Sequence, residues 1–353
     1  MTINERPEPK TIREAIAYFR EDMQNPIRRK IRLTGLLSTV AAIFRAFLLT
    51  GLCFIILMPF LQKISYSFRY VTDTDNPLVI WIPETWSIVN YKIGLECLQF
   101  SRSFWVSLTL SAIATLLQVL STAIAGYAFA RLKFKGSTVF FYIVLFALVV
   151  PDEALKGTRS LFFSNNRFLW INLIKLATYT SPFLPWQVLR SCAAIFIMSA
   201  FGQGLRSSIF IYLFRQFFRN VPIELEESAQ VDGASVTQTF WRVMFPNARG
   251  TIITVALFSF VWQYNDSYYA SIYGINTIAT RLANISSSSI KLVVGLYEEF
   301  RLIFGSDLII DERMVGLIGN TCALIMMVPL LIGYFFVQRL FVESIERTGL
   351  TGM

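Results

Sequence analysis

Histidine is absent from this sequence, and charged residues are scarce. None of the 353 residues is His, and only 16% are Asp, Glu, Lys or Arg, whereas a soluble protein carries about 25%. The absence of histidine excludes a Ser-His-Asp triad and any histidine-ligated metal site. The four cysteines are scattered without metal-ligand spacing, and no G-x-x-x-x-G-K-S/T string is present. The sequence therefore predicts no catalytic residue, no metal site, no P-loop and no cofactor bound by this chain.

Apolar residues are, in contrast, abundant. Hydrophobic residues make up 54% of the chain, and its 32 Phe equal Lys and Arg combined; the mean hydropathy is +0.53. So much apolar surface cannot be hidden in one soluble core, and we expect an all-α, polytopic transmembrane helical bundle. Six stretches come close to the roughly 20 residues that a spanning helix needs. They are 44–64, 104–128, 137–156, 192–214, 251–271 and 314–338.

Two of the six stretches contain interruptions. Pro151, followed by two acidic residues, cuts the third stretch short. Gly202 and Gly204 are placed to break the fourth and to let Arg206 reach water. We expect these two spans to be the least regular.

The distribution of charge predicts how the chain is oriented. Residues 1–38 are polar and are expected to form a cytoplasmic extension, and residues 39–353 form the membrane domain. Positive residues gather at 28–32 and in the short loop 131–135, which the positive-inside rule places in the cytoplasm. Six spans then put both termini in the cytoplasm. The net charge of +9 fits this topology and contact with anionic membrane lipid, and it gives no reason to expect a nucleic-acid partner.

The longest inner loop, residues 215–250, has the pattern of two short helices joined by a tight turn. Asn220 is suited to cap the first helix. Asp232-Gly233 is a turn dipeptide, in which the glycine is free to adopt positive φ.

The second helix of this loop has its own start and stop signals. Ser235 and Gln238 have the spacing of a capping box, and Pro246 is expected to end the helix. A compact helix–turn–helix of this kind is suited to docking a partner, which a flexible linker is not.

The same loop resembles the signature of ABC importer permeases, E-A-A-x3-G-x9-I-x-L-P. Glu227–Ala229 is followed by three residues, then Gly233, then nine residues and the segment Val243–Pro246. Both spacings match, with Ser, Val and Phe in place of Ala, Ile and Leu. The wider string P-x-E-L-E-E-x-A-x-x-D-G-A is similar to the carbohydrate branch, in particular to its maltose-type second permease subunit.

Two further segments carry the resemblance. Trp262, Asn265 and Asp266 are similar to that branch's W-N-D pattern, although two residues separate Trp from Asn. The C-terminal string QRLFVESIERTGLTGM is similar to its ending. The resemblance runs from about residue 40 to the end, and it implies the fold of a type I ABC importer permease with six spanning helices.

The resemblance also implies a role for the 215–250 loop, called the coupling loop below. It would sit in a cleft of a separate ATPase subunit and pass the closing motion of that subunit to the spans. Glu227 would pair with a basic group of the ATPase, Ala229 would permit close approach and Gly233 would form the turn. Glu226 and Asp232 are expected to belong to the same site.

The function implied is import of a sugar or oligosaccharide across a bacterial inner membrane. The chain would be a pore-forming permease subunit and not itself an enzyme, working by alternating access. Its implied partners are a cytoplasmic ATPase dimer that binds the ATP, a second permease subunit in a heterodimer, and an extracellular or periplasmic sugar-binding protein.

Small and polar residues mark one face of the second stretch. Steps of three or four place them on one side of a helix. The stripe consists of Ser107, Ser111, Thr115, Gln118, Thr122 and Gly126. Close packing between helices is the favoured explanation. A polar wall of the translocation path, with Gln118 at the substrate, is the alternative.

The fifth stretch offers further candidates for a substrate pathway. Trp262, Tyr264, Asn265 and Asp266 combine aromatic surface with hydrogen-bonding groups, as sugar binding requires. An ionisable group inside a bilayer needs a cavity or a partner, so Asp266 and Arg206 are functional candidates. Capping of a helix break by Asp266 is the alternative.

Two other functions remain open from the sequence. A secondary transporter or channel for a small polar solute predicts an internal repeat and mid-membrane ionisable residues, and no repeat is visible. A membrane enzyme acting on a lipid-linked sugar requires an acid–base constellation. Neither accounts for the coupling-loop motif.

Overall fold

The structure is a computed structural model that describes residues 24, 26–70, 73, 81–150, 152–165, 192–298, 300 and 310–350. Every regular element within these ranges is a helix, and the β-type pairing there is an isolated bridge between Arg69 and Trp86. The expectation of an all-α protein is therefore confirmed. Helices satisfy their own backbone hydrogen bonds, which a lipid environment demands.

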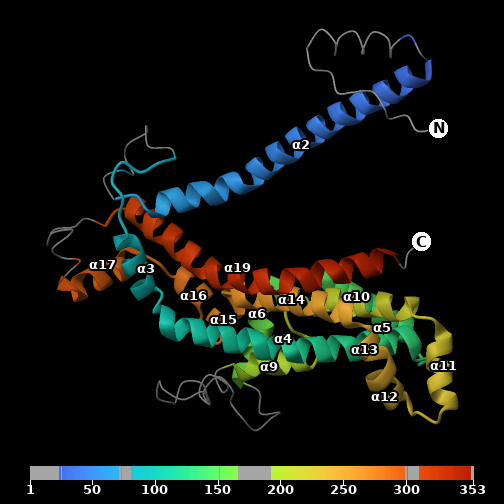
Figure 1. The fold of residues 1–353 in the computed structure, drawn as a ribbon. Coiled ribbons are helices and arrows are strands. Elements are labelled where there is room, and N and C mark those ends of the chain that lie inside the picture. Colours follow the sequence, from blue (N-terminus) through green and yellow to red (C-terminus); the bar gives the residue numbers. More distant parts are fainter. Residues whose placement is uncertain are drawn as a thin grey trace. The chain divides into compact units, whose positions relative to one another are not determined.

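The described helices follow one another along the chain as Figure 1 shows. The first group is α2 (Pro26–Ser67), α3 (Val89–Cys97), α4 (Phe100–Arg131), α5 (Ser137–Val149), η2 (Asp152–Leu155) and α6 (Lys156–Asn165). The second group is α9 (Ala193–Ala200), α10 (Ser207–Asn220), α11 (Ile223–Val231), α12 (Val236–Thr239), η4 (Phe240–Met244) and α13 (Phe245–Asn247). The third group is α14 (Arg249–Asn265), α15 (Tyr268–Ile272), α16 (Ile278–Ala283), α17 (Ser287–Leu296) and α19 (Glu312–Leu350).

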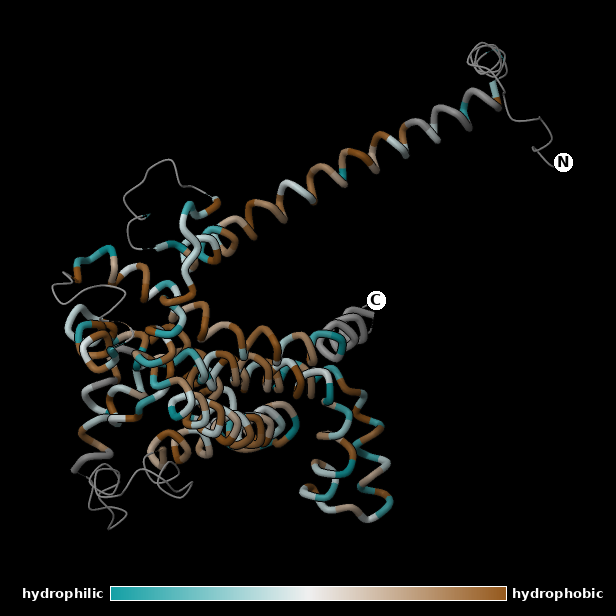
Figure 2. Tube along the Cα trace, turned by 60° about the vertical axis from the view of Figure 1, so that its left-hand side comes forward, coloured by the Kyte–Doolittle hydropathy of each residue, from teal (hydrophilic) through white to brown (hydrophobic). Residues whose placement is uncertain are grey.

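The chain divides into two compact units, residues 1–65 and residues 66–353. The described part of the first is a single helix, α2, whose segment Leu37–Ser67 is long and apolar enough to cross a membrane. Hydrophobic residues run along much of its length (Figure 2). A helix that is apolar on all sides is typical of a membrane span. The boundary predicted after residue 38 falls within α2 and stays a prediction.

In the second unit, α4 is the central helix. It packs against α9, α10 and α14, and α19 packs against α3 and α14. The closest approach is between α4 and α10: a Cβ atom added at Gly126 would lie 2.5 Å from the Cβ atom of Phe214. Only glycine permits the two helices to come this near.

One buried cluster joins these spans to the coupling loop, and we call it the loop-end cluster. It consists of Val119, Ala123, Tyr127, Phe210, Phe214, Phe218, Phe240, Met244, Ala248 and Val255. These residues come from α4, α10, η4 and the chain around the start of α14. The loop therefore shares a hydrophobic core with the helices that lead into the membrane.

Three predicted spans correspond to helices that are individually long and apolar enough to cross a bilayer. They are the stretches 44–64, 104–128 and 314–338, which lie within α2, α4 and α19. The described residues contain three such helices, or four if the segments Val236–Asn247 and Arg249–Asn265, bent by 78°, count as one. The total of six membrane spans stays a prediction.

The other three predicted stretches are broken. The third stretch is interrupted where its proline predicts: α5 ends at Val149, and Val150 is extended with ψ 119°, as expected for a residue that precedes proline. The fourth stretch is broken between α9 and α10, where Gly202 and Arg206 both have positive φ. This break was expected from the glycines. The fifth stretch, predicted to reach 271, ends its main helix at Asn265.

Candidate coupling loop and membrane interior

The first helix of the coupling loop, α11, begins at Ile223 with Pro222 as its N-cap residue. The expectation that Asn220 caps this helix is wrong, because Asn220 is the last residue of α10. Within the described part of the chain, no side-chain hydrogen bond caps α11. Its first turn instead carries Glu224 and Glu226, whose negative charge is favourable near the positive end of the helix dipole.

The turn after α11 has the predicted form. Gly233 has φ +81°. The N–H of Gly233 donates to the carbonyl of Gln230, and the N–H of Ala234 donates to the carbonyl of Ala229, both at 3.0 Å. This pair of bonds is the Schellman motif, which ends a helix with a left-handed glycine. The turn is therefore fixed by the backbone.

The second helix of the loop begins and ends as predicted. Ser235 Oγ accepts from the Gln238 N–H at 3.3 Å, and Gln238 Oε1 accepts from the Ser235 N–H at 2.9 Å. As predicted, Pro246 marks the end of the helix, which stops one residue later at Asn247, after the π-helical segment Phe240–Met244. Proline disturbs the α-helical turn that precedes it, and in this chain that turn is the π-helix. The 78° bend follows directly.

The inward face of α11 is held by charged and aromatic groups of α4. Tyr127 Oη donates to Glu226 Oε1 at 2.7 Å. Arg131 Nε lies 3.5 Å from Glu226 Oε2, and only 10% of either side chain is exposed. The Arg131 guanidinium also donates to the carbonyl of Val221. Glu226 thus contacts this chain's own spanning helix.

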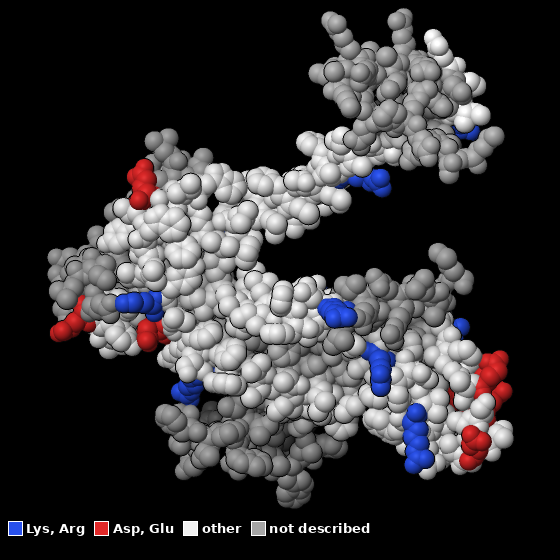
Figure 3. Space-filling view, viewed as in Figure 1, with Lys and Arg blue, Asp and Glu red and all other residues white. Residues whose placement is uncertain are grey.

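The outward face of the same loop is open. Glu227, Asp232 and Gly233 are exposed and Ala229 is half-buried. Beside them, 87% of Val231 is accessible. Acidic side chains gather over α11 at the right edge of Figure 3. Apolar and acidic groups side by side suit a partner that offers a basic residue next to a hydrophobic cleft.

In the membrane interior, Gln118 connects three segments. Its Nε2 donates to the carbonyl of Leu205 at 2.6 Å and to Ser207 Oγ at 2.8 Å. Its Oε1 accepts from Ser259 Oγ at 2.6 Å. The side chain ties α4 to the break before α10 and to α14. The polar stripe is used here for close helix packing, and a substrate role for Gln118 stays a prediction.

The four candidates at the end of α14 face different surroundings. The Trp262 ring stacks on Phe210, with centroids 5.4 Å apart, and the Arg206 guanidinium lies over it at 4.7 Å. Tyr264 is buried in the apolar cluster that α19 shares with α3 and α16. The structure therefore does not place the side chains of Trp262 and Tyr264 on one common surface that a substrate could contact.

Asp266 takes up the capping position that sequence offered as an alternative. Its carboxylate oxygens accept from the backbone N–H groups of Tyr268 and Tyr269 at 3.1 Å and of Ala270 at 3.3 Å. These are the first N–H groups of α15. Asn265, in contrast, is exposed.

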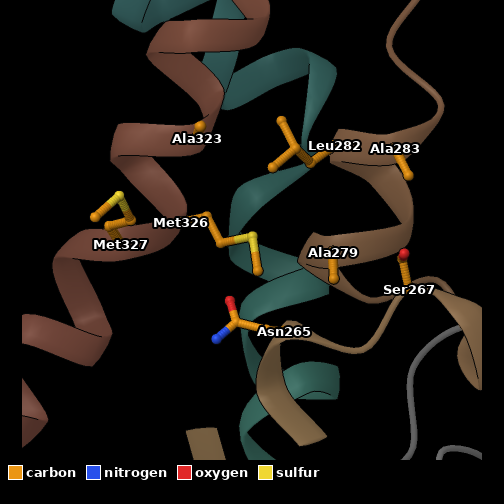
Figure 4. A pocket seen from close by; sticks show the side chains of 8 residues that line it. All are labelled: Asn265, Ser267, Ala279, Leu282, Ala283, Ala323, Met326 and Met327. Atoms are coloured by element: carbon orange, nitrogen blue, oxygen red, sulfur yellow. The ribbon is translucent and has the colours of Figure 1, made fainter. Parts of the chain in front are cut away.

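A shallow cavity of about 370 Å³ opens next to Asn265. Figure 4 shows Asn265 and Ser267 as its polar groups, with α16 and α19 supplying the apolar remainder. The lining residues are Asn265, Ser267, Ala279, Leu282, Ala283, Ala323, Met326 and Met327. Asn265, one of the predicted pathway residues, thus lies at a cavity.

Sequence reasoning missed Tyr127, and it used Arg131 only for topology. The two are four residues apart on α4, and this spacing places both on one helix face at its loop end. That spacing, together with an acidic residue in the next loop, is the signal that could have identified them.

Fold and loop together define a class of protein: a helical membrane protein with a folded loop whose outer face is open to a partner. Residues 93–347 match the family described as "Binding-protein-dependent transport system inner membrane component", and the chain belongs to this family. The family predicted from the coupling-loop motif is thereby confirmed. Membership implies a multi-pass membrane protein with a substrate-binding protein and an ATPase as partners.

Individual relatives agree with this assignment. The chain is 26% identical over 330 residues to the arabinooligosaccharides transport system permease protein AraQ of Halalkalibacterium halodurans, covering 92% of this chain and 100% of that protein. It is 22% identical over 264 residues to the probable starch degradation products transport system permease protein AmyC of Thermoanaerobacterium thermosulfurigenes, covering 75% and 81%. A crystal structure of a bacterial ABC transporter involved in the import of the acidic polysaccharide alginate shares the fold, with a TM-score of 0.52, 19% identity and coverage of 86% and 97%.

Proposed function

We propose that this chain is the permease subunit of an ATP-driven importer for a sugar or oligosaccharide. Its relatives are named for the transport of arabinooligosaccharides and starch degradation products, which supports a carbohydrate substrate. The single observation that carries the mechanism is the two-faced coupling loop. One face is fixed to α4 through Glu226, and on the other face Glu227 is exposed to solvent, where a partner can reach it.

The proposed membrane arrangement has six spans, with both termini and the coupling loop in the cytoplasm. α2, α4 and α19 supply three spans as single helices. The interrupted segments α5, α9–α10 and α14–α15 supply the other three. Interrupted helices are tolerated within a membrane where protein covers the freed backbone groups, and Gln118 and Asp266 do so at two of these breaks.

The proposed transport cycle uses two permease subunits of different sequence and an ATPase dimer that binds the ATP. A sugar-binding protein outside the cytoplasmic membrane delivers the substrate. Closure of the ATPase dimer moves the coupling loop, and the spans then expose the substrate path to alternate sides. Asn265 at its cavity, with Trp262, Tyr264, Asp266 and Gln118 as further candidates, would contribute to that path.

On the outer face of the loop, each predicted residue has a proposed part. Glu227 pairs with a basic group of the ATPase, Ala229 allows close approach, and Gly233 with Asp232 forms the turn that holds α11 in place. Ion pairs at such interfaces set register and specificity, and losing one partner weakens binding substantially. The apolar side chain of Val231 adds hydrophobic contact beside them.

The test is the Glu227→Lys variant in the assembled complex. The complex, with its ATPase and binding protein, is reconstituted into vesicles. We then measure uptake of a radiolabelled mixture of arabinooligosaccharides and starch oligosaccharides. We expect ATP-dependent uptake to fall at least about tenfold. Glu224→Lys, an exposed acidic residue on the same helix, is the matched control and should retain most of the uptake.

Two outcomes would contradict the proposal. Unchanged uptake with Glu227→Lys would remove the coupling role. Uptake driven by a proton gradient, with the ATPase subunit omitted, would show a secondary transporter instead.

A further inference from the structure

We propose that Tyr127, Glu226 and Arg131 form an internal latch that makes the coupling loop move with α4 as one body. This inference rests on the proposed function, because it concerns how a movement imposed on the loop reaches the membrane. It assigns to Glu226 a positioning role inside this chain and leaves the ATPase contact to its neighbour Glu227. The three residues are called the latch below.

The latch joins the loop to α4 by charge and hydrogen bonding in a buried place. The Glu226 carboxylate receives the Tyr127 hydroxyl on one oxygen at 2.7 Å and faces the Arg131 guanidinium with the other at 3.5 Å. A carboxylate that is nine-tenths buried is costly unless it is paired. Pulling α11 away from α4 would separate these groups, so the latch resists that motion.

Arg131 extends the latch to the start of the loop. Besides facing Glu226, its guanidinium donates to the carbonyl of Val221, which lies between the end of α10 and the start of α11. One arginine of α4 therefore holds the chain on both sides of Pro222. The entry of the loop and its first helix are fixed to the same point.

Tyr127 connects the latch to the rest of the loop. Its ring packs edge-on against Phe218 of α10, with centroids 5.6 Å apart, and in a tilted arrangement against Phe240 of η4, with centroids 5.1 Å apart. Phe218 and Phe240 contact each other at 6.2 Å. Through one side chain, α4 thus contacts α10, α11 and η4, so both helices of the loop are attached to it.

A movement of α4 at the latch has a route into the membrane. Thirteen residues, or about 20 Å of helix, separate Arg131 from Gln118, whose amide holds the break before α10 and the Ser259 side of α14. A rigid helix carries a displacement over that distance, and the hydrogen bonds of Gln118 pass it to two further segments. The segment of α4 between the latch and Gln118 thus connects the coupling loop to the helices that Gln118 contacts.

The Glu226→Gln variant tests the latch without changing the outward face of the coupling loop, which carries Glu227 and is called the docking face. The glutamine keeps the volume and can still accept the Tyr127 hydroxyl, but it removes the charge that faces Arg131. In the full reconstituted complex, we expect the ATPase subunit to copurify and ATP to be hydrolysed. Uptake of the radiolabelled oligosaccharide mixture per ATP hydrolysed should fall about fivefold or more. The matched Glu227→Gln variant should instead lose copurified ATPase.

Tyr127→Phe is the second, milder variant. It keeps the aromatic ring in the loop-end cluster and removes only the hydroxyl donor, so the fold is preserved. We expect a smaller loss of uptake per ATP, about twofold to threefold. The combined variant Tyr127→Phe/Glu226→Gln should lose less than the product of the two single losses, since both act on one contact.

The outcomes distinguish the latch from the proposed function. If both latch variants keep the wild-type ratio of uptake to ATP hydrolysis, the latch is wrong while the importer stands. If Glu226→Gln loses the ATPase subunit as Glu227→Gln does, Glu226 belongs to the docking face, and the latch is wrong. If the wild-type complex takes up the oligosaccharides without ATP, driven by a proton gradient, the proposed function itself fails.

Discussion

The loop end and the middle of α4 hold their polar groups in different ways. At the loop end, charged Glu226 and Arg131 meet within an aromatic cluster, and Tyr127 occupies the remaining carboxylate oxygen. In the middle, the polar groups are neutral amides and hydroxyls. There the Gln118 amide makes three hydrogen bonds, whereas Ser111 Oγ and Thr115 Oγ1 have no hydrogen-bond partner among the described residues.

This difference indicates which part of α4 is rigid and which can rearrange. A buried ion pair inside packed aromatics has one good arrangement, and breaking it leaves an uncompensated charge. Neutral hydroxyls without partners cost less and lose nothing when their surroundings change. The loop end of α4 is therefore suited to move rigidly when the ATPase displaces the coupling loop. The middle of α4 is suited to change its contacts during transport.

The largest expected effect comes from the glycine between these two regions. Gly126→Ala should lower the unfolding temperature clearly, at a cost of about 1–3 kcal/mol, because its Cβ would lie 2.5 Å from Phe214 Cβ and 2.9 Å from the Arg215 nitrogen. The measurement is thermal unfolding of the purified chain in detergent. Gly316→Ala, at a helical site where no described residue would lie within 4 Å of the added Cβ atom, is the control and should be neutral or slightly stabilising. Equal behaviour of the two variants would show that α4 and α10 do not touch at Gly126.

The next effect tests the middle of α4. Gln118→Leu removes three hydrogen bonds and leaves Leu205 O, Ser207 Oγ and Ser259 Oγ without their partner. We expect a loss of about 2 kcal/mol in the free energy of unfolding, measured by chemical denaturation. Gln216→Leu on α10, which removes one exposed contact with Tyr212, should cost much less. If the Gln118 variant is as stable as the Gln216 variant, the hydrogen bonds of Gln118 do not hold α4 against its neighbouring helices.

A smaller effect separates capping from substrate binding at Asp266. Asp266 precedes the N-cap residue Ser267 and accepts backbone N–H groups with both carboxylate oxygens. Asp266→Asn keeps one of the two acceptors and should cost about 1 kcal/mol, whereas Asp266→Ala removes both and should cost more. If capping is its whole role, Asp266→Asn also keeps oligosaccharide uptake. Loss of uptake by a stable Asp266→Asn complex would place this carboxylate on the substrate path.

Sequence reasoning located what local chemistry determines. The stretch 104–128 lies inside α4, the glycines mark the break before α10, and the capping box and the Gly233 turn form as expected. Each depends on residues that are neighbours in the chain, since hydrophobic period, proline, glycine and capping side chains act over a few residues.

Tertiary contacts decided the rest. Glu226 and Glu227 are adjacent, so they point about 100° apart on α11. Nothing in the loop itself says which of them faces α4. That choice is made by Tyr127 and Arg131, which lie about a hundred residues earlier in the chain.

The smallest expected effect concerns a third carboxylate, Asp73, which is held mainly by the neutral donors of Thr85, with a smaller contribution from the charge of Arg69. Burial raises its pKa, but donation by the Thr85 N–H at 2.8 Å and the Thr85 hydroxyl at 2.7 Å lowers it more, so the pKa of Asp73 lies below its usual value. A lowered folded-state pKa stabilises the protein above the unfolded value of about 3.9 and loses that contribution as pH falls through the folded-state pKa. Thermal unfolding of wild type and Asp73→Asn should therefore differ at pH 6, with the wild type more stable, and converge toward pH 3. A difference that stays constant over this range would mean that the charge of Asp73 contributes nothing to stability.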